Sequence, residues 1–211
     1  MVKPLVHYFM NDKKLDSKIR LLTYNYNDAH FNFHSDLGVF SKNKIDYGSR
    51  LLVEAFLSFN KENKKSVLDV GSGFGFLGIT ISKILDCPVD MIDVNERAIH
   101  LTKMNIKENQ VEGNAFISDM YESVNSKYDV IITNPPIKAG KKVYLNILLD
   151  AKEYLNECGE LWFVIRVNHG AKSVIKCLEN VYFCEIMNKS KGFLIIKAKI
   201  RWHKVIKVIK F

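Results

Sequence analysis

A glycine-rich turn directly after an apolar segment is the first pattern in this chain that can do chemistry. The run Val67–Gly75 reads Val-Leu-Asp-Val-Gly-Ser-Gly-Phe-Gly, and a helical pattern follows it. Glycine permits positive φ and lets the backbone approach a ligand, and the N–H groups of the following helix can bind a carboxylate or phosphate. The spacing Gly73-x-Gly75-x-x-Gly78 also fits the dinucleotide fingerprint. The turn therefore predicts a nucleoside cofactor without separating NAD from others.

Two carboxylates follow the next two predicted strands. Asp93 closes the segment Val89–Asp93, where it would face the cofactor crevice and accept hydrogen bonds from both ribose hydroxyls. Asp119 follows the third strand, where a loop that contacts the base would lie. The alternative role for Asp119 is the N-cap of a helix.

The run Asn134-Pro135-Pro136-Ile137 follows a fourth apolar strand. Two prolines fix the backbone where it leaves the sheet and remove two N–H donors, so that carbonyl groups face the crevice. The Asn134 side chain adds one carbonyl acceptor and one amide donor. A planar amino group that must become a nucleophile needs acceptors for its two N–H bonds, and the Asn134 side-chain oxygen and the Pro135 carbonyl supply them. Taken alone, the motif is also compatible with a rigid turn.

In this order, the motifs resemble those of class I S-adenosylmethionine-dependent methyltransferases. The Asn-Pro-Pro motif narrows the resemblance to enzymes that methylate amino or amide nitrogens. Upstream, Leu37–Ser41 and Asp46–Leu52 resemble the segment that precedes the fold in RsmC-like ribosomal RNA guanine-N2 methyltransferases, and Asn134–Lys142 is similar to the short, single-domain members. The resemblance implies S-adenosyl-L-methionine as cofactor, direct methyl transfer to a positioned amine, and a seven-stranded sheet whose last strand is antiparallel.

The resemblance also assigns roles to single residues. It implies a catalytic set of Asn134, Pro135, Pro136 and Ile137. It implies cofactor contacts from Asp69, Gly71, Ser72, Gly73, Gly75, Asp93, Val94, Asp119, Met120 and Asn134, with Phe40 and Ser41 from the upstream segment. Many Asn-Pro-Pro enzymes have Phe or Tyr in place of Ile137, and that ring stacks on the target base. Isoleucine offers apolar contact only, which makes Phe40 a candidate platform.

The expected substrate is an exocyclic amino group of RNA, first of all guanine N2 of small-subunit ribosomal RNA. Adenine N6 and a protein glutamine amide are the alternatives within methyltransferases. From other classes, an NAD(P)-dependent oxidoreductase would use the same glycine loop but leaves Asn134-Pro135-Pro136 unexplained, and a non-catalytic RNA-binding module would keep only the fold. The modified nucleotide, the choice between free RNA and the assembled subunit, and the oligomeric state stay open.

The elements that must position these residues alternate along the chain. Strand and helix patterns in turn predict a doubly wound α/β fold with a mostly parallel sheet. Expected strands are Val67–Val70, Val89–Asp93, Asn114–Ser118, Tyr128–Thr133, Glu160–Arg166, Val181–Met187 and Gly192–Lys199. Expected helices are Leu77–Leu85, Glu96–Lys107, Val143–Leu155 and Ala171–Leu178. The short segment Asn188–Lys191 predicts a tight antiparallel turn between the last two strands.

The first 60 residues differ from the rest. Two segments with alternating aromatics flank Asn27-Asp28 and predict a hairpin. Ser49 is expected to cap a helix that carries apolar residues at helical spacing. We expect residues 1–60 to pack on the core as a dependent extension, and residues 61–211 to form the methyltransferase domain with a basic C-terminal tail.

The net charge of +8 comes from 31 basic and 23 acidic residues, and the last 25 residues contain eight Lys or Arg and no acidic residue. Such an excess favours a polyanionic partner, here ribosomal RNA or the small ribosomal subunit, although a solvated tail would look the same. The candidate RNA-binding residues are Lys138, Lys141 and Lys142 after the catalytic motif and Arg201 and Trp202 in the tail, where Trp202 can stack on a base. The alternative is that Trp202 packs the tail onto the domain.

Composition excludes several classes of protein. A hydrophobic fraction of 47% with 26% charged residues is typical of a globular chain. The chain has no apolar run near the ~20 residues of a membrane helix, and Lys3, Pro4 and His7 interrupt the start where a signal peptide is apolar. The four cysteines contain no CxxC pair, which predicts reduced thiols and no metal site. We therefore expect a cytoplasmic protein without a membrane partner.

Overall fold

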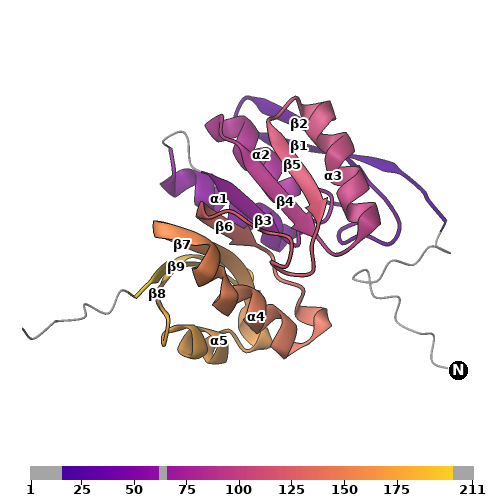
Figure 1. Cartoon of the computed structure of the whole chain (residues 1–211). Coiled ribbons are helices and arrows are strands. Elements are labelled where there is room, and N and C mark those ends of the chain that lie inside the picture. Colours follow the sequence, from indigo (N-terminus) through magenta and orange to yellow (C-terminus); the bar gives the residue numbers. More distant parts are fainter. Residues whose placement is uncertain (1–15, 62–65, 202–211) are drawn as a thin grey trace, which may run out of the picture.

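A seven-stranded sheet forms the centre of the computed structural model, which describes residues 16–61 and 66–201 (Figure 1). The strand order is β5-β4-β3-β6-β7-β9-β8. The strands are β3 (Val67–Val70), β4 (Val89–Asp93), β5 (Gly113–Ile117), β6 (Tyr128–Thr133), β7 (Leu155–Arg166), β8 (Tyr182–Ser190) and β9 (Phe193–Ile200). All neighbouring pairs are parallel except those of β9, which lies antiparallel between β7 and β8. The predicted doubly wound fold with an antiparallel last strand is confirmed.

Helices cover both faces of the sheet (Figure 1). The helices α1 (Tyr47–Phe59), α2 (Phe76–Leu85) and α3 (Glu96–Asn109) pack on one face, and α4 (Lys141–Asp150) and α5 (Ala171–Leu178) pack on the other. Short 3-10 turns lie at Ile137–Ala139, Ala151–Tyr154 and Val167–His169. Successive residues of β7 point to opposite faces of the sheet. Trp162 packs on Phe56 of α1, while Phe163 is buried on the side of α4 and α5. No helix within these described ranges has the length and apolar character needed to cross a bilayer.

A separate two-stranded sheet of β1 (Arg20–Tyr26) and β2 (Ala29–Ser35) covers the outer side of α2 and α3. Its aromatic side chains Tyr24, Phe31 and Phe33 are buried, with the rings of Phe33 and Phe76 5.5 Å apart. The amide groups of Asn105 and Asn109 on α3 bond the backbone of β2. Residues 20–60 thus share one hydrophobic core with the face of the main sheet that carries α1, α2 and α3.

Several predicted boundaries were wrong. The predicted turn Asn188–Lys191 lies largely within β8, which runs to Ser190, and the expected strand Glu160–Arg166 begins already at Leu155. The expected helix Val143–Leu155 ends at Asp150, a 3-10 turn follows, and Leu155 already pairs with Tyr128 as the first residue of β7. The apolar pattern continues through this turn because both the helix and the strand bury residues in the same core. Helix α1 is capped by Asp46, whose carboxylate accepts the Ser49 N–H at 2.9 Å, and not by Ser49. Ser49 lies instead in the first turn of the helix.

The strand directions decide where the site forms. The parallel strands β3, β4, β6 and β7 end at the same edge of the sheet, and β9 begins there because it is antiparallel. Phe193 at the start of β9 therefore pairs with Arg166 at the end of β7. The β8–β9 turn at Lys191 and Gly192 lies at this same edge, with φ values of 46° and 79° that suit a two-residue hairpin turn.

Candidate functional site

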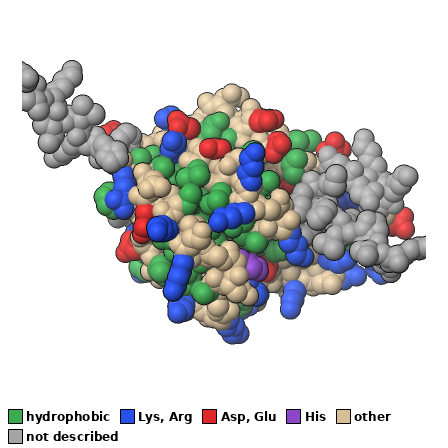
Figure 2. All heavy atoms as spheres, turned by 90° about the horizontal axis from the view of Figure 1, so that it is seen from below, with side chains coloured by type: hydrophobic (Ala, Val, Ile, Leu, Met, Phe, Trp, Pro, Cys, Tyr) green, Lys and Arg blue, Asp and Glu red, His purple; other side chains and the backbone are tan. Residues whose placement is uncertain are grey.

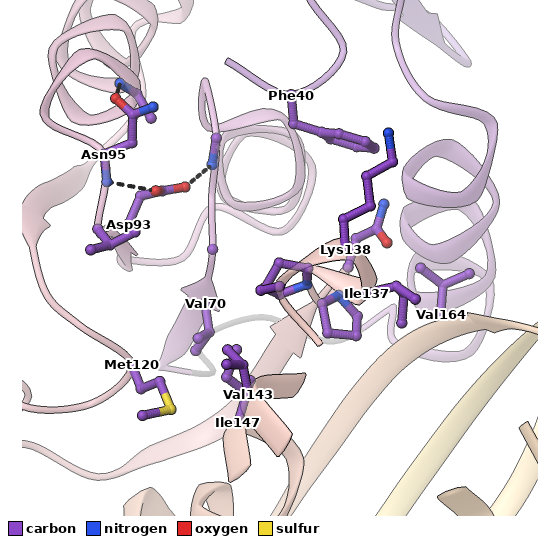
Figure 3. Close-up of a pocket in the computed structure, with 18 of the residues that line it drawn as sticks. Phe40, Val70, Asp93, Asn95, Met120, Ile137, Lys138, Val143, Ile147 and Val164 are labelled. Atoms are coloured by element: carbon purple, nitrogen blue, oxygen red, sulfur yellow. Dashed lines mark hydrogen bonds between the residues drawn. The ribbon is translucent and has the colours of Figure 1, made fainter. Parts of the chain in front are cut away.

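A cavity of about 550 Å³ runs along the carboxyl edge of the sheet (Figure 3). The loops after β3, β4 and β5 line one part of it, and the other part is lined by residues 134–139, the end of β7 and the start of β9. Open α/β sheets bind ligands at this edge. The structure thus brings the glycine turn, Asp93, Asp119 and the Asn-Pro-Pro motif into one cavity, although they are spread over more than sixty residues.

The glycine turn provides room for a ligand at two positions. Gly71 and Gly73 have φ of +71° and +60°, and a Cβ on either would meet no atom within 4 Å. The N–H groups of Gly71 and Ser72 both donate to the Ile92 carbonyl at 2.9 Å, which fastens the turn to β4. Gly75 has a packing role instead. It does not line the cavity, and a Cβ on Gly75 would come within 2.8 Å of the Ile79 side chain.

The Asp93 carboxylate joins the glycine turn to the next loop. Its Oδ2 accepts the Gly73 N–H and its Oδ1 accepts the Asn95 N–H, both at 2.9 Å (Figure 3). Burial raises the pKa of Asp93, while these backbone N–H groups act to lower it. A carboxylate has about four lone-pair sites and the backbone of Val94 also acts on it, so Asp93 keeps acceptor capacity for a ligand's hydroxyl group.

Beneath the turn, Asp69 is fully buried and only partly hydrogen-bonded. Its Oδ2 accepts the Gly78 N–H at 3.0 Å, while its Oδ1 has no partner within the described part of the chain. Burial raises the pKa of Asp69 to about 7, and the charge of Asp93 adds to this effect. The buried Ser72 hydroxyl likewise has no partner among these residues. The Ser72 side chain lines a smaller hollow behind the glycine turn, whereas Asp69 lines neither this hollow nor the main cavity.

The remaining predicted cofactor residues lie around the same end. Val94, Asp119 and Met120 line the cavity, with Val94 38% exposed. Asp119 begins a turn rather than a helix, since the Glu122 N–H donates to its carbonyl at 3.1 Å, so the N-cap alternative was wrong. Phe40 also lines the cavity. Ser41 lies beside Ser72 in a smaller hollow behind the glycine turn.

Asn134 is held by two residues from the start of α1. Its amide nitrogen donates to the Ser49 hydroxyl at 2.8 Å and to the Asp46 carboxylate at 3.2 Å. Both N–H bonds of the amide are therefore used, and the carboxylate can only accept. The side-chain oxygen has no donor among the described residues. Asn134 thus presents an acceptor, and no donor, to the cavity.

The rest of the motif turns the chain into the 3-10 segment. The Pro135 carbonyl accepts the Ile137 N–H at 2.9 Å, and the Pro136 carbonyl accepts the Ala139 N–H at 2.9 Å. A carbonyl has two lone pairs, so Pro135 can accept a second hydrogen bond. All four residues from Asn134 to Ile137 line the cavity, and the Ile137 side chain lies beside Val164 (Figure 3).

The predicted basic residues are found at different places. Lys138 lines the cavity and extends toward Phe40 (Figure 3). Lys141 and Lys142 begin α4, outside the lining, and Lys141 donates to the Ser173 hydroxyl at 3.1 Å. The face on which α4 and α5 lie carries Lys and Arg side chains over its middle and lower part, with most acidic side chains toward the top (Figure 2).

Of the two predicted tail residues, Arg201 is not part of this cavity. Arg201 follows the far end of β9, at the opposite edge of the sheet, where its guanidinium lies 4.1 Å from the centre of the Phe183 ring. Trp202 lies outside the described residues.

Four residues at the site were not singled out for these contacts from the sequence: Asp46, Ser49, Arg166 and Phe193. Asp46 and Ser49 stand 88 and 85 residues from Asn134, so no local pattern links them to it. For Arg166, the available signal was a charged residue at the end of a buried strand, the same signal that singled out Asp93.

Comparison with known proteins places the chain among methyltransferases. Residues 30–197 match the family model described as methyltransferase small domain. The chain belongs to this family. The YbxB protein of Bacillus subtilis (strain 168), named as uncharacterized, is 39% identical over 198 residues, which are 92% of this chain and 98% of YbxB. The Ribosomal RNA small subunit methyltransferase C of Buchnera aphidicola is 35% identical over 165 residues, 76% of this chain and 47% of that protein.

Solved structures of methyltransferases share the fold. The 16S rRNA N2 methyltransferase RsmC of T. thermophilus, solved in complex with AdoMet and guanosine, has a TM-score of 0.79 at 23% identity, over 89% of this chain and 52% of that chain. The chain spans about half the length of the RsmC proteins it matches. The resemblance to RsmC-like methyltransferases that the motifs predicted is therefore confirmed. Among the described residues, no cluster of His, Cys, Asp and Glu is arranged to hold a metal ion.

Proposed function

We propose that this methyltransferase domain transfers a methyl group from S-adenosyl-L-methionine to an exocyclic amino group of RNA, with guanine N2 of small-subunit ribosomal RNA as the first candidate. The observation that carries the proposal is the state of Asn134. Asp46 and Ser49 accept both N–H bonds of its amide, so only its oxygen is available to a substrate.

An acceptor at this position selects the chemistry. A substrate amino group brings N–H bonds that the Asn134 oxygen and the second lone pair of the Pro135 carbonyl can accept. These two acceptors would orient the nitrogen and stabilise the positive charge that develops on it during methyl transfer. A group that can only accept hydrogen bonds would find no donor in this amide.

The residues at the other end of the cavity fit the proposed cofactor. When bound, S-adenosylmethionine supplies a methyl group that its sulfonium already activates. Asp93 would accept hydrogen bonds from the ribose, and Val94, Asp119 and Met120 would surround the adenine. Gly71 and Gly73 leave space for the amino-acid part, near the Ser72 hydroxyl, which has no partner among the described residues. Phe40 lines the cavity and Ser41 lines the smaller hollow with Ser72, and both belong to the proposed cofactor site.

Three observations support RNA as the substrate. A relative that is 35% identical is named a ribosomal RNA small subunit methyltransferase, and the T. thermophilus RsmC structure contains guanosine together with AdoMet. The chain carries a net charge of +8. Lys138 lines the cavity, and Lys141 and Lys142 follow it at the start of α4, where a phosphate backbone would pass.

The test is to incubate the protein with labelled S-adenosylmethionine and with either naked ribosomal RNA or small ribosomal subunits from cells that lack the protein. Nucleoside mass spectrometry should detect N2-methylguanosine. Label in N6-methyladenosine or in protein glutamine would contradict guanine N2 and select one of the other two amines. Thermal stabilisation by NAD but not by S-adenosylhomocysteine would contradict methyl transfer altogether.

Two variants show whether the chemistry comes from this site. Asn134→Ala should lose about a hundredfold or more in turnover with much less change in cofactor affinity. Asn114→Ala is the matched control, because Asn114 is exposed at the start of β5 and its side chain bonds, within the described part of the chain, only the Asp90 carboxylate at 2.9 Å.

A further inference from the structure

A cluster of cations and aromatic rings adjoins the part of the cavity that lies beyond Asn134. The Arg166 guanidinium carbon lies 4.3 Å from the centre of the Phe193 ring, and both residues line the cavity. Phe193 is nearly buried, whereas Arg166 is exposed at the end of β7. A guanidinium on a ring is a flat, positively charged surface.

The cluster continues away from the cavity over Tyr47. The rings of Tyr47 and Phe193 are 5.7 Å apart, and the Lys191 ammonium lies 4.9 Å and the Arg50 guanidinium 5.5 Å from the centre of the Tyr47 ring. We call these five residues, Arg166, Phe193, Tyr47, Lys191 and Arg50, the cation–aromatic track.

The track is a fixed part of the fold. The Tyr47 hydroxyl and the Ser190 hydroxyl are hydrogen-bonded at 2.8 Å, which joins the start of α1 to the tip of the β8–β9 hairpin. Gly48 lies between the Phe193 ring and the Asp46 carboxylate. A Cβ on Gly48 would come within 2.9 Å of both, so glycine is required at this position. The residues that hold Asn134 and the residues of the track are therefore packed against each other.

The charges of the track are largely uncompensated. Across residues 16–61 and 66–201, no carboxylate forms an ion pair with Arg166 or Lys191, and Arg50 pairs with half-buried Glu54 at 3.6 Å. Flat cationic and aromatic surfaces in series suit a ligand that alternates flat bases with negative phosphates. Proteins bind unpaired nucleotides in this way, by stacking bases on aromatic rings or guanidinium planes.

We propose that the cation–aromatic track binds the single-stranded RNA around the target nucleotide. Arg166, supported from behind by Phe193, stacks on the target base, and Tyr47, Lys191 and Arg50 hold the adjoining nucleotides. This inference rests on the proposed function. It also supplies the stacking surface that Ile137 does not provide.

The test is to measure, by fluorescence anisotropy, how the protein binds a labelled single-stranded RNA of about twelve nucleotides. The protein is saturated with S-adenosylhomocysteine. Arg166→Ala and Tyr47→Leu should each weaken binding about tenfold, the effect of losing one stacked base. Arg166→Lys keeps the charge, so the salt dependence of the RNA affinity should not change. Its RNA affinity should still be lower than that of wild type, because the flat guanidinium is lost. Lys191→Ala should make the slope of log affinity against log salt shallower by about 0.7.

Two control variants separate the track from general effects. Lys83 also lies over an aromatic ring, 5.1 Å from the centre of Phe31, but in the last turn of α2 outside the cavity, so Lys83→Ala should bind within twofold of wild type. Tyr47→Phe removes the bond to Ser190 and keeps the ring, so its loss of RNA affinity should be clearly smaller than that of Tyr47→Leu. An unchanged melting shift with S-adenosylhomocysteine shows that each variant is folded.

The outcomes distinguish this inference from the proposed function. If the wild type methylates RNA while Arg166→Ala and Tyr47→Leu bind RNA normally, the track is not the RNA site and the proposed function stands. Equal losses in Lys83→Ala and Lys191→Ala would likewise overturn the track, because they would indicate binding by net charge alone. If the label enters ribosomal protein and not RNA, both proposals are overturned.

Discussion

The hydrogen bonds from Asn134 to Asp46 and Ser49 lead to a prediction about catalysis at a distance from the substrate. A neutral hydrogen bond contributes about 1 kcal/mol and one to a carboxylate about 2 kcal/mol, so the two together favour the observed amide orientation over its flipped form by about 3 kcal/mol. That is a ratio of about a hundred to one. Flipping would also turn the amide oxygen toward the Asp46 carboxylate, which repels it.

Removing these bonds should release the amide stepwise. Ser49→Ala leaves the Asp46 bond and a preference of about 2 kcal/mol, which keeps nearly all amides in the productive orientation. Asp46→Ala leaves about 1 kcal/mol, which still keeps most of them there. Losses of turnover, a few-fold for Ser49→Ala and about tenfold for Asp46→Ala, are therefore expected from looser positioning of the amide rather than from its flipped form. The double variant has no preference and a loosely held amide, so its turnover should approach that of Asn134→Ala, about a hundredfold below wild type. Because Asp46 and Ser49 act through Asn134, KM for the cofactor should change little.

The assay is a double-mutant cycle on kcat. If Asp46 acts only through Asn134, Asp46→Ala should have no further effect on turnover in the Asn134→Ala background. Equal effects in both backgrounds would refute the reasoning. Asp46→Asn should restore most of the activity, since its side-chain oxygen can accept the same two bonds.

The N-cap of α1 requires a separate control, because Asp46 also accepts the Ser49 N–H. Loss of this cap should lower the free energy of unfolding by about 1 kcal/mol in Asp46→Ala. Asp46→Ser keeps a capping hydroxyl but ends one bond closer to the backbone than the carboxylate oxygen. It should therefore regain stability in thermal unfolding without regaining turnover.

Three more predictions concern Asp93 in the cavity and charged residues near it. Asp93→Ala should weaken S-adenosylmethionine binding by ~2–3 kcal/mol in calorimetry, and unchanged affinity would refute its role as ribose acceptor. Asp69 keeps its proton up to about pH 7 in the folded protein but only to about 3.8 when unfolded, so unfolding releases a proton between these values. The free energy of unfolding, measured by denaturant titration, should then fall as pH rises from about 4 to about 7, and Asp69→Asn should flatten this dependence. The Lys141→Ala, Lys142→Ala double variant should make the salt dependence of RNA affinity shallower by about 1.4 to 1.8 log units per log unit, with cofactor affinity as the unchanged control.

The sequence by itself determined the features that depend on neighbouring residues. Positive φ at Gly71 and Gly73 follows from their place between an apolar strand and a helix, and the antiparallel last strand follows from the short turn before Phe193. The hairpin around Asn27-Asp28 could also be predicted, since its aromatic residues alternate on both sides of a two-residue turn. Local conformation and hydrophobic periodicity act over a few residues, so they can be read without knowing the fold.

Only the tertiary structure decided which atoms of these motifs are available. The sequence predicted an acceptor and a donor at Asn134, and packing of α1 against the sheet edge uses both amide N–H bonds and leaves the acceptor. Likewise, Gly75 belongs to the glycine motif, yet the side chains of Ile79 and Thr102 make it a packing residue. Arg201 reads as part of a basic tail, and the antiparallel direction of β9 carries it to the edge opposite the cavity.

The physical reason is the range of the interactions. A hydrogen bond or a guanidinium–ring contact acts over 3 to 5 Å in space, and its partners at this site stand tens of residues apart along the chain. Burial and strand direction bring these partners together, and the sequence immediately around each residue does not reveal which partner it will meet. The sequence therefore determined which chemical groups reach the carboxyl edge of the sheet, and the packing of α1 and the β8–β9 hairpin on that edge decided how those groups point.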